Sequence, residues 1–502
     1  MSVLIKKLAG QTVAYGLSSI VGRALNFLLL PLYTGVFALG EYGTVSELYA
    51  YVAFLNIVFT YGMETAYFRF ANRPDADRQR LYDEVQTLLV VSSVLLSTLL
   101  VVFSGQLAQL LDYAPYQHYL IFLSLIVGVD AIVSVPFARL RLEGKAFKFA
   151  FIRLLNIVVV VVANLLFLKV FPDIRQGLYL EGLQPIVSRI HNPDLGIGYI
   201  FLINLGANLL YIPLLWKEIG AMRFRLDLDR LKPMWRYAYP LMIMGLAGVV
   251  NEVIDRILLR HYLPEGLYPD LTNEAVVGIY SACYKLAIFM SLAIQAFRYA
   301  AEPFFFSQAA DKNSPQTFAL VMRGFVLTCA FLFVAVSANL EIFALLFLRQ
   351  PEYWLGLPVV PVLLMANLFL GVYYNLTVWF KLTDRTYYGT YIGVGGAIIT
   401  IVLNLLLIPV LGYMGSALAT LACYFSMALV CYLLGNRHYP IPYPVGALTG
   451  YLALAIGLVA VALAVPITND LFRHGFRMGI SLLFPLIVFL LEWPGLRRKR
   501  AL

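Results

Sequence analysis

The chain has few charged residues for its length. Only 13% of its 502 residues are Asp, Glu, Lys or Arg, whereas 61% are hydrophobic, and the mean hydropathy is +0.80. Soluble domains carry about 25% charged residues. This composition therefore excludes an ordinary soluble protein. The net charge of +9 would suit a nucleic-acid partner, but the membrane topology described below explains it, and we expect no nucleic acid.

Cysteine and histidine are scarce, and their positions exclude several kinds of chemistry. The five histidines lie at the ends of apolar segments or in loops, without a ligand pair, and no Walker-type phosphate loop is present. The only long outer loop, 172–196, is small for a catalytic domain. We therefore predict a protein that is not an enzyme and that has no cofactor and no metal site. The cysteines lie within apolar segments and are expected to be small buried hydrophobes: Cys283, Cys329, Cys423 and Cys431.

Long apolar runs extend from one end of the chain to the other. Each is about 20 residues long, enough to cross the roughly 30 Å of hydrocarbon in a bilayer. We predict an all-α polytopic membrane protein with about fourteen transmembrane helices. The predicted spans are 12–37, 42–68, 81–103, 119–140, 149–171, 198–216, 237–262, 276–306, 317–340, 357–380, 386–409, 413–434, 445–466 and 476–491.

The basic residues indicate how these spans are oriented. Lys6 and Lys7 precede an apolar run that is too long for a signal peptide and has no small-residue cleavage site. With the N-terminus in the cytoplasm, more than two thirds of the 37 Lys and Arg residues fall in cytoplasmic segments, as the positive-inside rule requires. The even number of spans then places both termini in the cytoplasm and the loop 172–196 outside.

The two halves of the chain resemble each other. A shift of 229 residues superposes Gly16 on Gly245 and Tyr33 on Tyr262, and a shift of 235 superposes Ser46 on Ser281. Because six spans separate the copies, they have the same topology, and a pseudo-two-fold axis along the membrane normal relates them. We predict an N-lobe of six helices (1–216), a cytoplasmic amphipathic linker (217–236), a C-lobe of six helices (237–438), and two C-terminal helices with a basic cytoplasmic tail (439–502).

Several charged residues lie inside the apolar runs. An ionised group in hydrocarbon costs several kcal/mol, so such residues normally face a partner or a wet cavity. We predict that they line one cavity between the lobes. The substrate-binding candidates are basic: Arg23, Arg256, Arg260, Lys285 and Arg298. The gating or coupling candidates are acidic: Glu47, Glu64, Glu252 and Asp255.

A purely structural role stays open for part of this set. Glu252, Arg256 and Arg260 are spaced i, i+4, i+8, so they form one stripe that internal pairing would neutralise. Arg23 and Lys285 have no acid three or four residues away, which favours a cavity role, whereas Arg298 has Glu302 four residues later.

Two segments resemble a known family of transporters. The segment LNFLLLPLYT followed by EYG, and the second-half segment VGIYSACYKLAIFMSLAIQAFRYAAEPFF, are similar to the polysaccharide flippases. These O-antigen and exopolysaccharide exporters belong to the multidrug, oligosaccharidyl-lipid and polysaccharide exporter superfamily and are related to the lipid II flippases. The resemblance covers essentially the whole chain in length, span count and lobe order.

The resemblance implies a function in the bacterial cytoplasmic (inner) membrane. The substrate would be an undecaprenyl-diphosphate-linked oligosaccharide, moved from the inner to the outer leaflet by alternating access, with membrane lipids as the other partners. Arg23 and Arg256 match the placement of the family's cavity arginines. Asp255 matches one acid of the lipid II flippases' sodium site, but the span 386–409 contains no acid. The coupling ion, H⁺ or Na⁺, therefore stays open.

The alternatives to a glycan exporter come from two classes of protein, other transporters and membrane enzymes. A lipid II flippase or a cation/drug antiporter of the same superfamily is possible; an antiporter needs unpaired intramembrane carboxylates, of which Glu64 is the best candidate, whereas the basic excess favours an anionic substrate. A membrane glycosyltransferase or glycan polymerase would need catalytic loops with paired acids, and the short loops argue against it.

The repeat also suggests how the lobes gate. Glu47 lies near the equivalent of Lys285, and Glu64 lies near the equivalent of Arg298. We predict that Glu47 pairs with Lys285 when the outside is closed and that Glu64 pairs with Arg298 when the inside is closed. The alternative is that Glu64 pairs within its own lobe.

Overall fold

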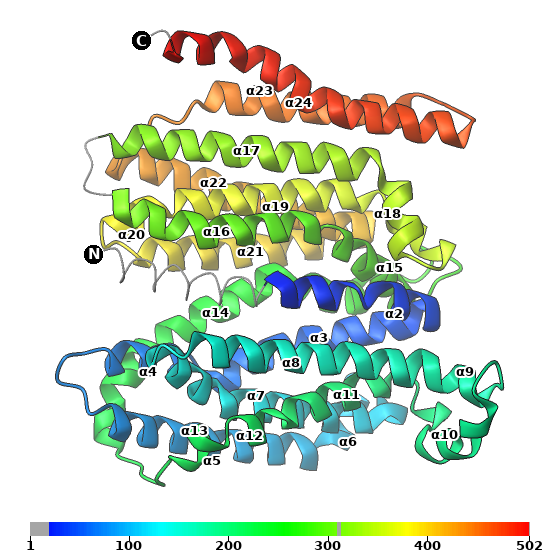
Figure 1. Cartoon of the computed structure of the whole chain (residues 1–502), viewed down its shortest axis with the longest axis vertical. Helices are drawn as coiled ribbons and strands as arrows, with labels where there is room; N and C mark the ends of the chain where they lie inside the picture. The colour runs from blue at the N-terminus through cyan, green and yellow to red at the C-terminus, as the bar shows by residue number, and fades with distance from the viewer. Residues whose placement is uncertain (1–19, 309–312, 501–502) are drawn as a thin grey trace. The chain divides into compact units, whose positions relative to one another are not determined.

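The computed structural model describes residues 20–308 and 313–500, and in these residues it contains helices and loops but no β-strand (Figure 1). The predicted all-α fold class is therefore confirmed. By their contacts the residues divide into two compact units, Met1–Ile257 (unit 1) and Leu258–Leu502 (unit 2). The division falls inside one continuous helix, α14 (Leu228–Tyr262). The predicted boundaries of lobes and linker stay a prediction.

Unit 1 is built around the helix α7. It packs against α3, α4, α5, α8 and α11. The described helices of unit 1 before α14 are α2 (Leu30–Val36), α3 (Leu39–Thr60), α4 (Met63–Ala71), α5 (Arg78–Val102), α6 (Ser104–Leu110), η1 (Ala114–Tyr116), α7 (Gln117–Leu142), α8 (Ala146–Leu165), η2 (Leu166–Val170), α9 (Phe171–Arg175), η3 (Glu181–Leu183), α10 (Gln184–Ile190), η4 (Pro193–Leu195), α11 (Gly198–Leu209), α12 (Tyr211–Leu214) and α13 (Trp216–Gly220).

Small and polar residues hold α5 against α7. A Cβ at Gly128 would clash with Ser97 Oγ, so a larger residue would displace this hydroxyl group from its position. Ser97 Oγ donates to the carbonyl of Ser124 (3.0 Å), and Gln86 Nε2 donates to the carbonyl of Ile132 (2.8 Å). Inside a membrane, where apolar surface gives no preference for another helix over lipid, such contacts supply the specificity of packing.

Unit 2 has two groups of packed helices: α19, α21 and α22 pack together, and α17 packs against α23 and α24. The helices are α15 (Asn273–Leu286), α16 (Ile288–Gln308), α17 (Ser314–Ala338), α18 (Leu340–Phe347), η5 (Pro351–Gly356), α19 (Val359–Leu376), α20 (Val378–Leu382), α21 (Tyr387–Leu411), α22 (Tyr413–His438), α23 (Val445–Ala464) and α24 (Asp470–Arg500).

Ten helices in the described residues are long and apolar enough to span a membrane, and the bent pair α15 and α16 raises this number to eleven. Two shorter apolar helices, Ile20–Val36 and Gly198–Leu214, lie where the first and sixth spans are predicted. The chain is thus a multi-span membrane protein, and the number fourteen stays a prediction. The start of the first span (12–19), Gly16, Lys6 and Lys7 lie outside the described residues, as do the side chains of Glu302 and of the basic tail 493–502.

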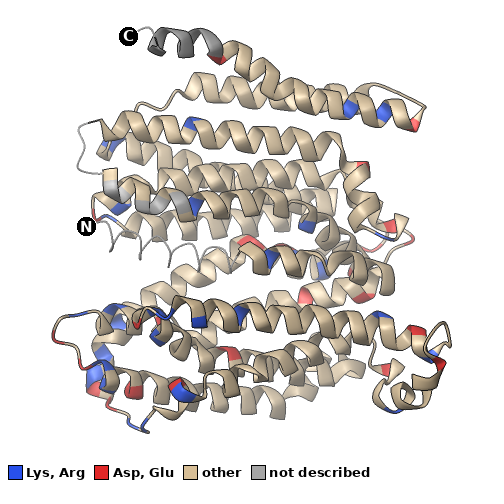
Figure 2. Cartoon of the chain, viewed as in Figure 1, with Lys and Arg blue, Asp and Glu red and all other residues tan. Residues whose placement is uncertain are grey.

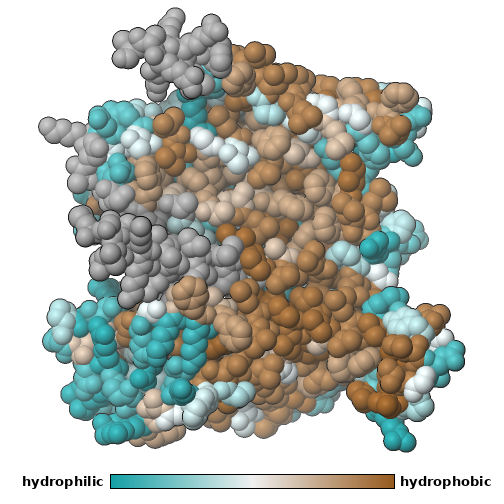
Figure 3. Space-filling model, in the orientation of Figure 1, coloured by the Kyte–Doolittle hydropathy of each residue, from teal (hydrophilic) through white to brown (hydrophobic). Residues whose placement is uncertain are grey.

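Charge is concentrated at the ends of the unit 1 helices, and the face shown between these ends is largely apolar (Figures 2 and 3). At one of these ends, the starts of α5 and α8 form ion pairs with the predicted cytoplasmic linker (217–236). Arg80 at the start of α5 pairs with Asp227 (3.4 Å), and Lys148 at the start of α8 pairs with Glu218 (2.6 Å). Their position on one side agrees with the predicted topology, whereas the orientation of the termini stays a prediction.

Candidate functional site

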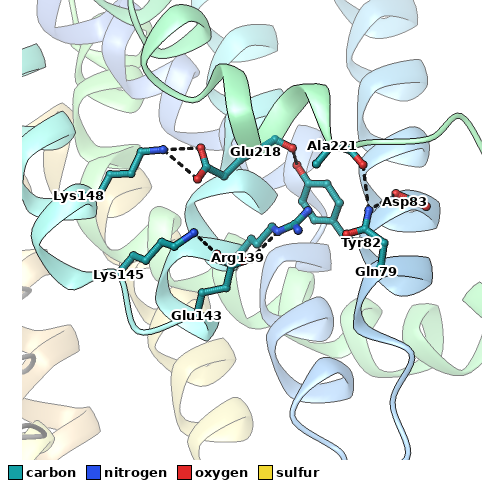
Figure 4. A network of polar contacts seen from close by, with 9 residues as sticks. All are labelled: Gln79, Tyr82, Asp83, Arg139, Glu143, Lys145, Lys148, Glu218 and Ala221. Atoms are coloured by element: carbon teal, nitrogen blue, oxygen red, sulfur yellow. Dashed lines mark hydrogen bonds and ion pairs between the residues drawn. The ribbon is translucent and has the colours of Figure 1, made fainter.

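A polar network fastens α13 and Ala221, the residue that follows it, to this end of unit 1 (Figure 4). Both carboxylate oxygens of Glu218 accept from Lys148 Nζ (2.9 and 2.6 Å), and its backbone carbonyl accepts from Tyr82 Oη (2.7 Å). Gln79 Nε2 donates to the carbonyl of Ala221 (2.9 Å) and to Asp83 Oδ1 (2.8 Å). Every charge in this network has a partner, so we assign it a structural role.

The same network holds a carboxylate of the α7–α8 loop in its ionised form. Glu143 accepts from Arg139 Nε (2.7 Å) and pairs with Lys145 Nζ (2.6 Å). Burial alone raises the pKa of Glu143, but the hydrogen bonds and charges of Arg139 and Lys145 outweigh it and hold the pKa below its usual value. Arg139 also lies over the Tyr82 ring, 4.5 Å from its centroid.

The two acids predicted as gates in unit 1 have partners inside that unit. Glu47 on α3 is only 1% exposed and accepts from Tyr113 Oη (2.5 Å) and Tyr51 Oη (3.2 Å). Glu64, in the first turn of α4, forms an ion pair with Arg141 from the end of α7. The Glu64 contact is the pairing within one lobe that the sequence left open as the alternative.

The charges of α14 are paired in a way that their spacing did not indicate. Arg256 Nη1 lies 3.0 Å from Asp255 Oδ1 and donates to the backbone carbonyl of Glu252 (2.7 Å). Asp255 is 3% exposed, whereas the Glu252 side chain is exposed. Arg256 is thus neutralised by the adjacent Asp255, and not by the side chain of Glu252 one turn away, which the i, i+4 stripe would require. Arg260, in unit 2, pairs with Glu274 of α15 (2.5 Å).

Two predicted arginines have no carboxylate partner among the described residues. Arg23 is exposed on the apolar helix Ile20–Val36. Arg298 on α16 is also exposed, and its guanidinium lies 4.1 Å from the centroid of the Tyr374 ring. The pocket around Arg298 includes Thr377 and Lys381 of unit 2. Because an ionised group in hydrocarbon costs several kcal/mol, both guanidinium groups need water or an anion.

The last predicted basic residue, Lys285, lies in the final turn of α15, half-buried. The helix ends one residue later, and α16 continues at 45°. Within the described residues, therefore, the contacts bring together Asp255 and Arg256, while they give Glu47, Glu64 and Arg260 partners that lie outside the predicted set.

Sequence reasoning missed one charged residue of unit 1. Asp130 lies at the middle of α7, half-buried, and its Oδ1 accepts from Asn208 Nδ2 of α11 (3.0 Å). Asn208 Oδ1 accepts in turn from Asn156 Nδ2 of α8 (3.2 Å). The signal was present, because Asp130 is the only ionisable residue in the apolar run IVGVDAIVSV. The prediction of cavity residues overlooked it.

Solved structures of transporters share the fold. The lipid II flippase MurJ in an inward closed conformation matches with a TM-score of 0.70 and 12% identity, covering 96% of this chain and 100% of the flippase. An inward-facing multidrug resistance MATE family transporter matches at 0.59 and 12%, covering 85% and 96%. The MATE multidrug transporter DinF-BH matches at 0.60 and 14%, covering 87% and 96%. At these identities the likeness establishes the fold alone.

The sequence identifies the family. No curated protein matches this chain. The signature of the family described as "Polysaccharide biosynthesis protein" matches residues 8–309, which is more than half of the chain and includes nearly all of unit 1. The chain therefore belongs to the polysaccharide biosynthesis protein family, as its sequence resemblance predicts.

Proposed function

We propose that the protein flips an undecaprenyl-diphosphate-linked oligosaccharide from the inner to the outer leaflet of the bacterial cytoplasmic membrane. Transport would proceed by alternating access through a basic cavity, without an enzymatic step. The observation that carries the proposal is the family match over residues 8–309 on a fold shared with a lipid II flippase over its full length. The predicted N- and C-terminal lobes would be the two moving parts.

The arginines without a carboxylate partner support an anionic substrate. A guanidinium binds diphosphate oxygens through several charge-assisted hydrogen bonds. Arg23 and Arg298 meet this requirement best, because no described carboxylate neutralises either of them. Arg256 and Arg260 are engaged by Asp255 and Glu274, so we assign them and Lys285 a secondary role in lining the same cavity.

A lipid II flippase or a cation/drug antiporter is the alternative, because the fold is shared with both kinds of transporter. An antiporter for cations would use unpaired carboxylates. Glu64 is engaged by Arg141, which weakens its assignment to that role. Glu252 has an exposed side chain, so it can be tested as the carboxylate that an antiporter would use.

The test is a flipping assay in liposomes that contain the purified chain. The substrate is a fluorescently labelled undecaprenyl-diphosphate oligosaccharide. An impermeant quencher lowers its fluorescence only after the labelled lipid has reached the outer leaflet. Arg23→Ala and Arg298→Ala should each slow flipping about tenfold or more, since hydrogen bonds to charged groups are worth about 1.5–3 kcal/mol. Arg→Lys should not restore the rate, because an ammonium group cannot replace the planar fork of a guanidinium.

Arg189→Ala is the matched control, because Arg189 is an exposed arginine of the loop 172–196 and should leave the rate unchanged. Wild-type rates in both cavity variants would refute the roles of the arginines. Flipping of labelled lipid II but not of the oligosaccharide lipid would favour the first alternative. Export of a cationic dye with no lipid flipping would favour the antiporter.

A further inference from the structure

The middle of unit 1 contains a carboxyl group in a hydrogen-bonded network. Asp130 accepts from Asn208 (3.0 Å), which accepts from Asn156 (3.2 Å). One turn before Asn208 on α11, Asn204 Nδ2 donates to Tyr49 Oη of α3 (2.8 Å). Four helices thus direct polar side chains to one region. Asn208 and Asn156 are 5% and 7% exposed, so the network lies within the unit.

The depth of Asp130 limits its possible states. α7 runs from Gln117 to Leu142, so Asp130 lies about 18–20 Å from either end at 1.5 Å per residue. That distance places the carboxyl near the midplane of a bilayer whose hydrocarbon is about 30 Å thick. No described cation lies within ion-pair distance of Asp130. A bare carboxylate at this depth costs several kcal/mol, so the group requires a proton or a cation.

Three charged or titratable groups act on Asp130 electrostatically. They are Arg153 of α8, Tyr49 of α3 and Tyr211 of α12. The Arg153 guanidinium is held by aromatic groups, 4.2 Å from the centroid of the Phe137 ring and 3.5 Å from Tyr211 Oη. The cation is therefore near enough to act on Asp130, but its own contacts hold it out of an ion pair. The helices α4, α5, α6, α11 and α13 also pack against α7, and none of their described residues contributes a charge that acts on Asp130.

The donors around the carboxyl fit a proton better than a metal cation. Asn208 presents its N–H group to Asp130, and its oxygen is already used by Asn156. A metal cation needs several oxygen ligands. The described residues contain no group of three or more His, Cys, Asp or Glu side chains that could hold a metal ion. The positive charge of Arg153 also disfavours a second cation.

We propose that Asp130 is a proton-binding site inside unit 1 and that its protonation drives the transport cycle. The carboxylate takes a proton from the aqueous phase on one side of the membrane, becomes neutral and still accepts from Asn208. It returns the proton when the unit changes its exposure. Protonation alternates the charge of Asp130 between minus one and zero beside a permanent arginine, so the net charge of the network changes from neutral to positive. The coupling step rests on the proposed function, whereas the proton site does not.

Infrared spectroscopy of the purified full-length protein tests the site without transport. Above about pH 5, where ordinary carboxyl groups are ionised, the wild type should still show a carboxylic-acid C=O stretching band that disappears at higher pH and shifts in D₂O. Asp130→Asn, which preserves shape and the contact with Asn208, should lack this band. Asn208→Ala should move the band to higher frequency, because the carbonyl loses a hydrogen-bond donor. Glu143→Gln is the matched control and should retain the band, since the Glu143 carboxylate is held ionised by Arg139 and Lys145.

Survival of this band above about pH 5 in Asp130→Asn would overturn the site. Loss of the wild-type band on adding sodium chloride at constant pH would overturn the assignment of the proton and indicate a sodium site.

The coupling step is tested in the liposomes described above. A pH gradient should change the wild-type flipping rate several-fold and leave the rate of Asp130→Asn unchanged. An equal response in both proteins would overturn the coupling step. If wild-type liposomes flip no lipid-linked glycan at all, the proposed function fails, and the infrared band still decides whether Asp130 binds a proton.

Discussion

Glu47 and Glu64 show that two acids in similar apolar runs need not have similar roles. Glu47 is sealed inside unit 1 by two tyrosine hydroxyl groups, whereas Glu64 is about one-third exposed and pairs with Arg141. A carboxylate that is sealed by neutral donors is difficult to move to another partner, because those donors would lose their acceptor. An exposed ion pair is worth only about 0–1 kcal/mol and exchanges easily. Glu64 is therefore the better candidate for a gate.

A charge swap tests the partner of Glu64. Glu64→Arg places two cations together and should slow flipping of the lipid-linked glycan, while the melting temperature falls only slightly because the pair is partly exposed. Adding Arg141→Glu should restore the rate, since it recreates the pair in reverse. Adding Arg298→Glu should not restore it. If the rate recovers in Glu64→Arg with Arg298→Glu but not in Glu64→Arg with Arg141→Glu, the result would instead support the gate predicted from the internal repeat.

The charged residues themselves could be predicted from sequence, because a charge in an apolar run is conspicuous. Their partners could not. Asp255 neutralises Arg256 because the two residues are adjacent on the helix and the guanidinium folds back, and spacing rules for i, i+4 pairs do not anticipate this contact. Arg141 comes from another helix, 77 residues after Glu64. Only the packing of α4 against α7 brings these two residues together.

At the scale of the helix, breaks explain most differences between predicted and observed spans. The predicted span 42–68 divides into α3 and α4 at Tyr61 and Gly62, which have φ angles of 34° and 76°. A Cβ at Gly62 would lie 2.9 Å from the carbonyl oxygen of Ala238, so glycine is needed here for space as well as conformation. The predicted span 276–306 bends at Ala287, where neither glycine nor proline marks the break. Hydropathy cannot predict either break.

A tight helical corner gives a second prediction. Gly412, with a φ angle of 57°, joins α21 to α22, and a Cβ at Gly415 would lie 2.5 Å from the carbonyl oxygen of Leu407. Backbone atoms cannot rotate away, so Gly415→Ala should push α22 from α21 and destabilise unit 2 by about 1–3 kcal/mol. Thermal unfolding of the purified protein should show a lower melting temperature.

Gly457→Ala on α23 is the control for this substitution, because no atom lies within 4 Å of the added Cβ. Its melting temperature should equal or exceed that of the wild type, since alanine favours a helix. Equal melting temperatures for Gly415→Ala and the wild type would show that the corner yields to the added methyl group.

At the scale of the molecule, the predicted topology is open to a direct experiment. The four cysteines are buried, so an introduced cysteine reports with little background. Gln184→Cys, in the exposed loop 172–196, should react with an impermeant thiol reagent added to intact cells. Arg225→Cys, four residues after Ala221 of the network in Figure 4, should react only after the cells are opened. The reverse pattern would invert the orientation and contradict the positive-inside assignment.

The exposed surface has a consequence for how the chain acquires its structure. Large apolar side chains such as Phe147 (82% exposed) and Val410 (69% exposed) cover the outside of both units, as they fill the inside. Burial of apolar area therefore does not determine which helices pack together once they are in lipid. The sparse polar and small residues, such as Gly128 and Asn208, determine the specificity of helix packing instead. Substitutions at these few positions should cause misassembly in the membrane far more often than substitutions among the many leucines.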